Sequence, residues 1–258
     1  VPSYAVIGAS RGMGLELVRQ LAKCTRSGTH TVFATARNKY TSTHLNSVLK
    51  GHHENIYVLE ADASAASEAA KVADGASDVL IYNAARLDGE YVLRGLLDFH
   101  SEEKLHTEFI EAFEVNVLGA IHAINAFLPL LRKGVAKKII LVSGDSSQHE
   151  WVQTTQMTAM AALSITKCAL GMVGVKYSVE LKEERFTVVG VNPEWVDTSA
   201  KAGDQRTALS PENQATFAEL VSKLKAMYPN AKARSPEVAV YHLLKTIESV
   251  GLADSGSY

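Results

Sequence analysis

The residues able to do chemistry begin with a glycine-rich stretch near the start of the chain. The sequence IGASRGMG places Gly8, Gly12 and Gly14 between the apolar run YAVIG and an amphipathic run that begins at Met13. Gly8 permits a tight turn, Gly12 lets the backbone approach a phosphate, and Gly14 allows close packing of a helix on a strand. The N–H groups at the helix N-terminus then favour a pyrophosphate. The stretch therefore predicts a dinucleotide site, with a purely structural turn as the alternative.

Two arginines bear on which dinucleotide binds. A chain selective for NAD usually has an acid after its second strand, which binds the ribose 2′-hydroxyl. Here the stretch FATARN carries Arg37 and no acid, and Arg11 in the glycine turn adds a second cation. Both can pair with a 2′-phosphate through charge-assisted hydrogen bonds. We therefore predict NADP(H), with further contacts from Ser10 and Met13; the alternative for Arg37 is a solvated loop cation.

The alternation of apolar runs along the chain predicts the fold that positions these residues. Short runs rich in β-branched residues alternate with longer amphipathic stretches. The predicted strands are YAVIG, HTVFATA, NIYVLEA, SDVLIYNAA, KKIILVSG and FTVVGVNPEW. The predicted helices are Met13 to Cys24, about Lys104 to Leu131, and Thr158 to Leu181. This order predicts an α/β fold of one domain, residues 1–258: a Rossmann-type, doubly wound parallel sheet with helices on both faces.

The C-terminal part carries two further expectations. Residues 195–211 form a long polar connection, which we predict to be a substrate loop because loops of that length are usually functional. The final letters ADSGSY are typical of the beginning of one more strand.

The composition narrows the class of protein. The 258 residues are 47% hydrophobic and 21% charged, and the net charge of -2 gives no field that attracts nucleic acid or an anionic membrane. No apolar run approaches the roughly 20 residues of a membrane helix, and the N-terminus shows no signal-peptide pattern. The two cysteines, Cys24 and Cys168, lie in helix-like segments. We expect two buried thiols, a cytoplasmic location and no metal site.

With these residues placed, the chain resembles the short-chain dehydrogenase/reductase family over nearly its whole length. It looks most like the carbonyl-reductase branch near the C-factor and sniffer proteins. The resemblance is carried by GASRGMG, YNAA, EVNVLGA, Lys167 and VNPEWVDT. It implies that Asn116 organises a water near the active lysine, Lys167. The implied cofactor contacts are Asp62 at the adenine, Asn83 near the sheet edge, Lys167 at the nicotinamide ribose, and Val196 and Thr198 along the carboxamide.

The chain departs from this family at the two positions that touch the substrate oxygen. The family's tyrosine, four residues before Lys167, is Leu163, and its serine falls on Gly144. Ser143 is one residue away and would point to the other side of a strand. Losing a general acid typically costs about 10²–10⁴ in rate, so ketone reduction should be poor. An iminium ion is already cationic and accepts hydride without a proton, and Leu163 then shapes a pocket for a bulky apolar substrate.

The loop GDSSQHEW and the segment after the sixth strand supply the remaining polar candidates. Asp145 could pair with a cationic substrate nitrogen or, if desolvated, act as an acid; a turn residue is the alternative. Trp151 could stack on a flat ring such as an indole or pack beneath a lid. Glu194, which replaces the glycine of the family's Pro–Gly pair, and Trp195 would border the reactive face of the cofactor. Solvated or surface roles are favoured for the other side chains considered, His149, Arg86 and Arg132.

A narrower resemblance fits these departures. The intact glycine turn, Leu163, Lys167, SGDSS and NPEWVDT resemble the tyrosine-lacking fungal alkaloid reductase/Diels–Alderases of the malbrancheamide and paraherquamide type. That group implies NADPH-dependent reduction of a cationic prenylated-indole dipeptide intermediate, followed by an intramolecular [4+2] cycloaddition. The resemblance to the wider dehydrogenase/reductase family implies a homo-oligomer, a dimer or tetramer, formed through the two long helices. Two alternatives stay open: a carbonyl reductase using Asp145 or His149 as its acid, and an NADP-binding protein without turnover.

Overall fold

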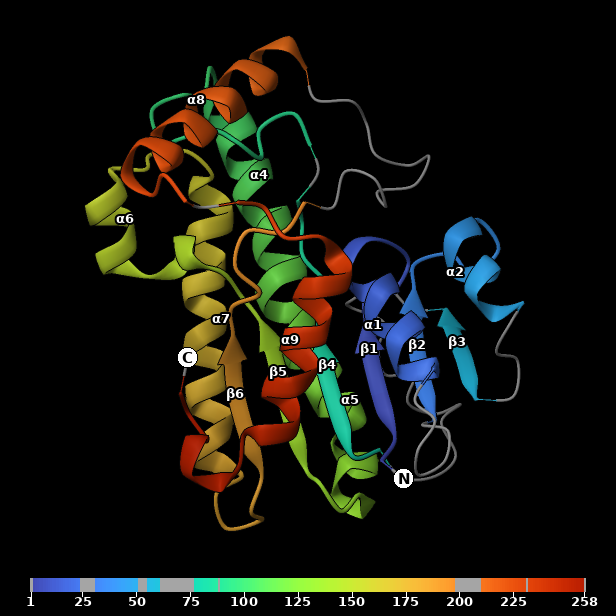
Figure 1. The fold of residues 1–258 in the computed structure, drawn as a ribbon. Helices are drawn as coiled ribbons and strands as arrows, with labels where there is room; N and C mark the ends of the chain where they lie inside the picture. Colours follow the sequence, from blue (N-terminus) through green and yellow to red (C-terminus); the bar gives the residue numbers. More distant parts are fainter. Residues whose placement is uncertain are drawn as a thin grey trace.

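A single parallel sheet forms the centre of the molecule (Figure 1). The computed structural model describes residues 2–23, 31–50, 55–60, 77–87, 89–197, 210–230 and 232–257. Its strand order is β3-β2-β1-β4-β5-β6, and every pairing is parallel. The strands are β1 (Tyr4–Ile7), β2 (Val32–Ala36), β3 (Ile56–Glu60), β4 (Val79–Tyr82), β5 (Lys138–Val142) and β6 (Thr187–Val191). The predicted doubly wound sheet is confirmed, and its order reverses between β1 and β4, where such sheets bind ligands.

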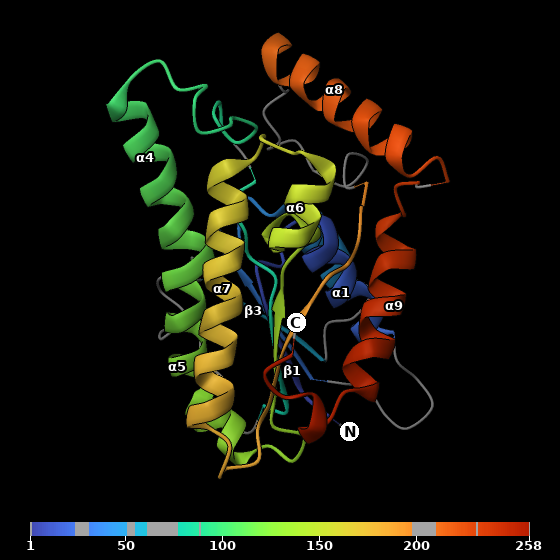
Figure 2. The same ribbon diagram turned by 90° about the vertical axis from the view of Figure 1, so that its left-hand side faces the viewer.

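Helices cover both faces of this sheet (Figure 2). One face carries α1 (Gly12–Ala22) and α9 (Pro236–Ser249), and the other carries α5 (Gly119–Lys133) and α7 (Ala161–Glu180). The remaining α-helices of the described residues are α2 (Thr43–Leu49), α4 (Glu102–Phe113), α6 (His149–Thr155) and α8 (Pro211–Met227). Both α6 and α8 lie beyond the carboxyl ends of the strands, at the top of Figure 1.

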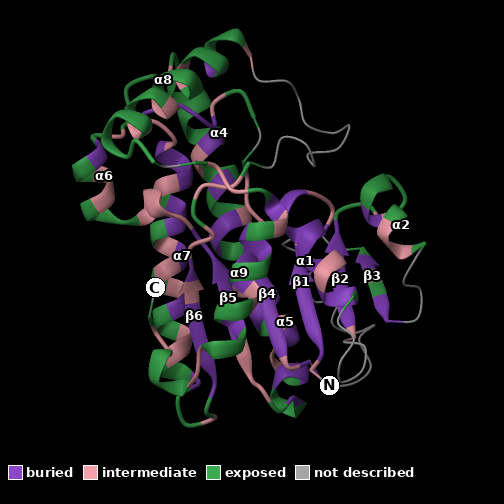
Figure 3. Cartoon of the chain, in the orientation of Figure 1, coloured by how far each residue is buried: buried purple, intermediate pink, exposed green. Residues whose placement is uncertain are grey.

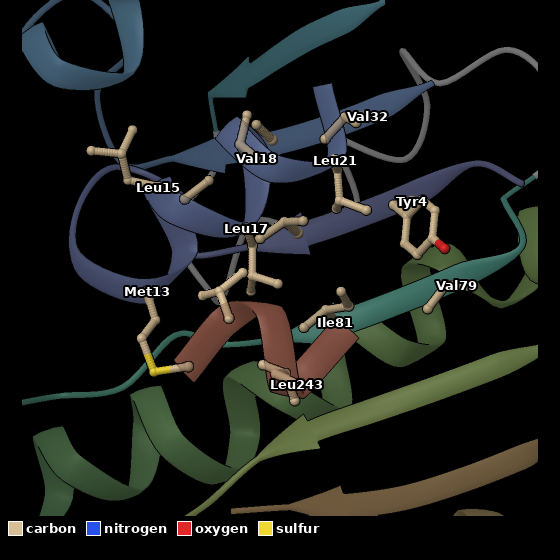
Figure 4. Packing of buried hydrophobic residues seen from close by; sticks show 14 of the residues in the cluster. Tyr4, Met13, Leu15, Leu17, Val18, Leu21, Val32, Val79, Ile81 and Leu243 are labelled. Atoms are coloured by element: carbon tan, nitrogen blue, oxygen red, sulfur yellow. The ribbon is translucent and has the colours of Figure 1, made fainter. Parts of the chain in front are cut away.

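The core is split into two layers by the sheet. Ile140 and Val189 point toward α1 and α9, whereas their neighbours Ile139 and Val188 point toward α5 and α7. All four are almost completely buried, and Figure 3 shows buried residues along the strands of the sheet. Figure 4 shows the first layer, in which α1 and α9 pack on the strands. Burial on both faces explains why these strands read as continuous apolar runs.

Three element boundaries differ from the predictions. The helix predicted for Lys104 to Leu131 is α4 and α5 joined by a π-helical turn, Glu114–Leu118. The helix predicted for Thr158 to Leu181 begins at Ala161, because Met160 has a left-handed backbone with φ 63°. The predicted terminal strand is not assigned as one: Leu252–Asp254 form a 3₁₀ turn that the Asp254 carboxylate caps at the Gly251 N–H. The residues that follow nevertheless run along β6, since the Gly256 N–H donates to the Val188 carbonyl and the Ser257 carbonyl accepts from the Gly190 N–H.

The cysteine prediction is also corrected. Cys168 is exposed on the outer side of α7, near the exposed Ile165 and Met172, so it is not a buried thiol. Helical periodicity alone did not show which side of this uniformly apolar helix meets the sheet. Cys24 lies outside the described residues.

The long helical stretch Glu102–Lys133 is sufficiently long and apolar to pass as a membrane span by length and composition. This differs from the expectation that no segment would reach that length. Half of its most apolar window is buried inside the fold. A core helix of a sheet protein passes the same test, so a single such helix is weak evidence for a membrane.

Candidate active site

The glycine turn is packed so closely that its residue types are required. Gly8 and Gly12 have φ angles of 82° and 56°, in the left-handed region that favours glycine. A Cβ on Gly14 would lie 2.0 Å from the Gly8 carbonyl oxygen and 2.7 Å from the Asn83 side-chain nitrogen. Asn83, at the end of β4, donates a 3.0 Å hydrogen bond to that same carbonyl. The structure thus joins the turn to Asn83 and leaves no room for a side chain at position 14.

The predicted cofactor contacts around this turn are placed as follows. Arg11 precedes α1 as its N-cap residue, and Arg37 is exposed directly after β2, which pairs with β1. Ser10 is half-buried, whereas the Met13 side chain packs in the core (Figure 4), so only the Met13 backbone N–H stays a candidate contact. A helix N-terminus beside two arginines fits a dinucleotide that carries a 2′-phosphate. Asp62 and Thr198 lie outside the described residues.

Lys167 is buried at the carboxyl end of β5. Its Nζ donates a 2.7 Å hydrogen bond to the carbonyl oxygen of Val142, the last residue of that strand. Burial lowers the pKa of Lys167 from its usual 10.5 to about 8, because the charged form loses its hydration. Leu163 lies one turn earlier on α7 and is also buried.

Asn116 holds three segments together from within the π turn. Its Oδ1 accepts from the Arg86 backbone N–H at 2.8 Å, and its Nδ2 donates to Thr166 Oγ1 at 2.8 Å. The Tyr82 hydroxyl donates to the carbonyl of Val115 in the same turn, and burial raises its pKa, so this phenol is a poor substitute for the missing acid. π turns of this kind frequently mark functional sites. The water predicted beside Asn116 stays a prediction.

The position of the family's serine is open. Gly144 has an extended backbone, with φ −175° and ψ 163°, which any residue adopts. A Cβ built on Gly144 would meet no heavy atom within 4 Å. Ser143 is buried, and its Oγ has no hydrogen-bond partner in the described part of the chain. The backbone at position 144 therefore does not require glycine, and the absence of a side chain on Gly144 leaves open space beside β5.

Asp145 occupies a half-buried turn, Asp145–Ser147, beyond β5. Its Oδ1 accepts a hydrogen bond from the side-chain nitrogen of Asn192, which directly follows β6. Partial desolvation raises the pKa of Asp145; the Asn192 bond opposes that shift and the charge of Glu194 adds to it. Sequence reasoning missed Asn192. The available signal was that β5 and β6 were expected in one sheet, so polar residues following them would meet at one edge.

Glu194 and Trp195 lie in the segment after β6, but the Glu194 carboxylate is engaged. Glu194 has φ 63°, and its carboxylate forms a 2.8 Å ion pair with Arg234. Arg234 also bonds the Trp195 carbonyl through its N–H, and Val196 forms an isolated bridge with Arg234. No local pattern relates position 234 to position 194, so this partner could not be read from the sequence.

Helices α6 and α8 pack together over this end of the sheet. Trp151 on α6 is half-buried, whereas His149 at its first position is exposed. Arg94, in the β4–α4 connection, pairs with Glu212 at the start of α8. The neighbouring Asn213 side chain donates a 2.9 Å hydrogen bond to the Glu90 carbonyl. These two contacts, which sequence reasoning also missed, tie α8 to that connection.

The remaining candidates have structural partners. Arg86 pairs with Glu108 and Glu111 on α4, at 2.9 and 2.6 Å. Arg132 pairs with Glu184 at 2.7 Å on the surface. Arg132 therefore has the surface role that was favoured for it, whereas Arg86, with 15% of its side chain exposed, is a mostly buried structural residue. The described residues contain no group of three or more His, Cys, Asp or Glu side chains placed to hold a metal ion.

Comparison with known proteins agrees with this geometry. The model of the short chain dehydrogenase family matches residues 3–209. The short-chain dehydrogenase/reductase atnB of Arthrinium sp is 35% identical over 86% of this chain and 84% of its own. The chain is also 27% identical, over its full length and 95% of the relative, to the short chain dehydrogenase virK of Hypocrea virens.

Solved structures of carbonyl reductases are similar in fold. The carbonyl reductase Sniffer of D. melanogaster has a TM-score of 0.74 and 23% identity, with 99% of this chain and 95% of that chain covered. The NADPH-bound carbonyl reductase from chicken fatty liver has a TM-score of 0.73 and 22% identity, with coverages of 99% and 94%. The second of these contains NADPH.

Proposed function

Because this chain belongs to the short-chain dehydrogenase family, we propose that it is an NADP(H)-dependent reductase whose substrate is a cationic iminium ion. The single observation that carries the substrate class is the pair Leu163 and Gly144. These replace the hydroxyls that would donate to a substrate oxygen, while Lys167 and the glycine turn are kept. A neutral carbonyl needs a proton as hydride arrives, whereas an iminium ion does not.

The residues of the chain divide the work as follows. NADPH supplies the hydride; it joins the iminium carbon, and the carbon–nitrogen π electrons become the amine lone pair. Lys167 and the glycine turn bind and orient the dinucleotide. The Asp145 carboxylate pairs with the cationic nitrogen, since it stands beside the open Gly144 position. Leu163 presents an apolar surface, and Trp151 stacks on the flat part of the substrate.

We further propose that the substrate is a bulky prenylated-indole dipeptide and that an intramolecular [4+2] cycloaddition follows the reduction. It rests on the resemblance to the tyrosine-lacking alkaloid reductases together with the space at Gly144. Holding diene and dienophile in one folded geometry lowers the entropic barrier and selects the face that reacts.

A carbonyl reductase with Asp145 as the acid is the second candidate. The observation in its favour is that partial burial raises the pKa of Asp145. His149 is less suited to that role because it is exposed on α6. A binding protein without turnover is the third candidate, since Lys167 can bind ribose without doing chemistry.

NADPH oxidation with a permanently cationic probe separates these functions. We expect turnover of an N-methyl-3,4-dihydroisoquinolinium ion and little turnover of a matched aromatic ketone. Ketone turnover that exceeds iminium turnover would favour the carbonyl reductase. NADPH binding by fluorescence, with neither probe reduced, would favour the binding protein. Leu163→Tyr should leave iminium reduction unimproved.

The proposed macromolecular partner is a second copy of the chain. Helices α4, α5 and α7 form one side of the molecule (Figure 2), and this side exposes apolar residues. They are Ile110, Phe113, Leu118, Ile165, Met172, Val175 and Val179. Exposed apolar patches of this kind mark interaction sites. Light scattering should give a dimer or tetramer, and Met172→Glu with Val179→Glu should shift it toward monomer.

A further inference from the structure

The segment after β6 is tied to the segment before α9 through one residue. The Arg234 N–H donates to the Trp195 carbonyl at 2.8 Å, and the Arg234 carbonyl accepts from the Asp197 N–H at 2.9 Å. The Arg234 guanidinium pairs with the Glu194 carboxylate at 2.8 Å. The first two contacts are backbone bonds that any residue other than proline could make at position 234. Only the ion pair depends on the arginine side chain.

Glu194 has an unusual backbone conformation. Its φ of 63° is in the left-handed region, which residues with a Cβ rarely occupy. Such conformations persist only where the surroundings enforce them. The carboxylate borders a cavity of about 250 Å³ between this segment and α9, and 58% of the side chain is exposed. Close packing therefore does not hold the Glu194 side chain, whose carboxylate is paired with Arg234.

The conformation of Glu194 is connected to the candidate site. The Glu194 N–H donates to the side-chain oxygen of Asn192 at 2.9 Å. The side-chain nitrogen of the same Asn192 donates to the carboxylate of Asp145. A change in the backbone at position 194 would therefore turn the Asn192 amide and release Asp145.

We infer that Arg234 is a positioning residue: it holds Glu194 in its left-handed conformation and thereby fixes Asp145, through Asn192, beside Gly144. The inference rests on the proposed function only in that Asp145 faces the substrate there. Arg234 itself touches neither Asp145 nor the open position at Gly144.

The charges around Asp145 give this arrangement a measurable signature. The charged and titratable side chains on the elements near Asp145 are Glu194 and Arg234 beyond β6, Lys167 on α7, and His149 and Glu150 on α6. Of these, Glu194 raises the pKa of Asp145, and Arg234 neutralises Glu194. Removing Arg234 leaves the Glu194 charge uncompensated and loosens the Asn192 bond, and both changes raise the pKa of Asp145 further.

The test compares Arg234→Met in two backgrounds. Carbon-13 NMR of the aspartate carboxyls, with Asp145→Asn to assign the signal, reports the titration of Asp145 without any substrate. We expect Arg234→Met to raise the midpoint by about half a pH unit. In a Glu194→Gly background the same substitution should change nothing, because glycine adopts φ 63° unaided and has no charge to neutralise. Arg234→Lys should restore most of the wild-type midpoint.

The controls separate positioning from a general effect. Arg132→Met removes a comparably exposed ion pair elsewhere and should leave the Asp145 midpoint unchanged. Exposed ion pairs contribute little to the free energy of unfolding, so these variants should fold. If Arg234→Met does not fold, Arg234→Gln replaces it in the same comparison. An equal shift in both backgrounds, or none in either, overturns the inference. A shift confined to the Glu194 background, with no iminium turnover by the wild type, upholds the inference and refutes the proposed function.

Discussion

Two glycines of this protein have opposite surroundings. At Gly14, in the cofactor region around β1 and α1, a Cβ would lie 2.0 Å from the Gly8 carbonyl oxygen. At Gly144, in the substrate region beyond β5, a Cβ would meet nothing within 4 Å. The same residue type is therefore a requirement of close packing in one region and a source of space in the other.

This difference separates the residues assigned to the dinucleotide from those that we propose select the substrate. In the cofactor region, backbone geometry, Asn83 and the helix N-terminus constrain one another closely. In the substrate region Gly144 is open, Leu163 replaces a polar group, and Asp145 is held by residues that come from distant segments. The first region suits one constant ligand, and the second can change without disturbing the sheet.

Gly14→Val should break the cofactor region and have the largest effect. The new side chain would overlap the Gly8 carbonyl and the Asn83 amide, and overpacking of this kind typically costs about 1–3 kcal/mol of stability. We expect NADPH binding, measured by fluorescence titration, to be lost. Gly144→Ala is the matched control and should keep NADPH affinity, because its position is open and extended. Tight NADPH binding by Gly14→Val would contradict the assigned role of the turn.

Restoring the two missing hydroxyls, at positions 163 and 144, should change which substrate the protein reduces. The double variant Leu163→Tyr, Gly144→Ser should raise kcat/KM for a simple ketone by up to about 10²-fold, since it returns a general acid to the site. Iminium reduction should not improve. If iminium turnover rises as much as ketone turnover, proton donation limits the natural reaction and the proposed substrate class is wrong.

The pH dependence of stability should report the burial of Lys167. The pKa of Lys167 is about 8 in the folded chain and 10.5 by its ordinary value, so between these pH values the unfolded chain binds more protons. The free energy of unfolding should therefore rise with pH in that window, by at most about 1.4 kcal/mol per pH unit from this group. Below pH 8 both states carry the proton, and above 10.5 neither does, so its slope vanishes.

Denaturant titrations at several pH values measure this slope. Lys167→Met should remove this contribution, whereas Lys176→Met, at an exposed position of the same helix, should keep it. An unchanged slope in Lys167→Met would show that the lysine is not desolvated.

The strands and the glycine turn were predictable because their causes are local. A continuous apolar run such as KIILV is typical of a strand buried on both faces of a parallel sheet. Gly8 and Gly14 are required because a Cβ at either position would collide with atoms of the same turn or of the residues that follow the neighbouring strand β4. The side of α7 that meets the sheet was not predictable, because apolar residues surround this helix, and Cys168 was therefore misassigned.

The sequence by itself determined the sheet, the glycine turn, and the absence of a hydroxyl at positions 163 and 144. Only the tertiary structure decided that Gly144 opens onto free space, that Asn192 bonds Asp145, and that Arg234 pairs with Glu194. The physical reason is the distance along the chain over which each cause acts. Turns and strand periodicity depend on neighbouring residues, whereas an ion pair or an empty volume depends on segments that meet only after the chain has folded.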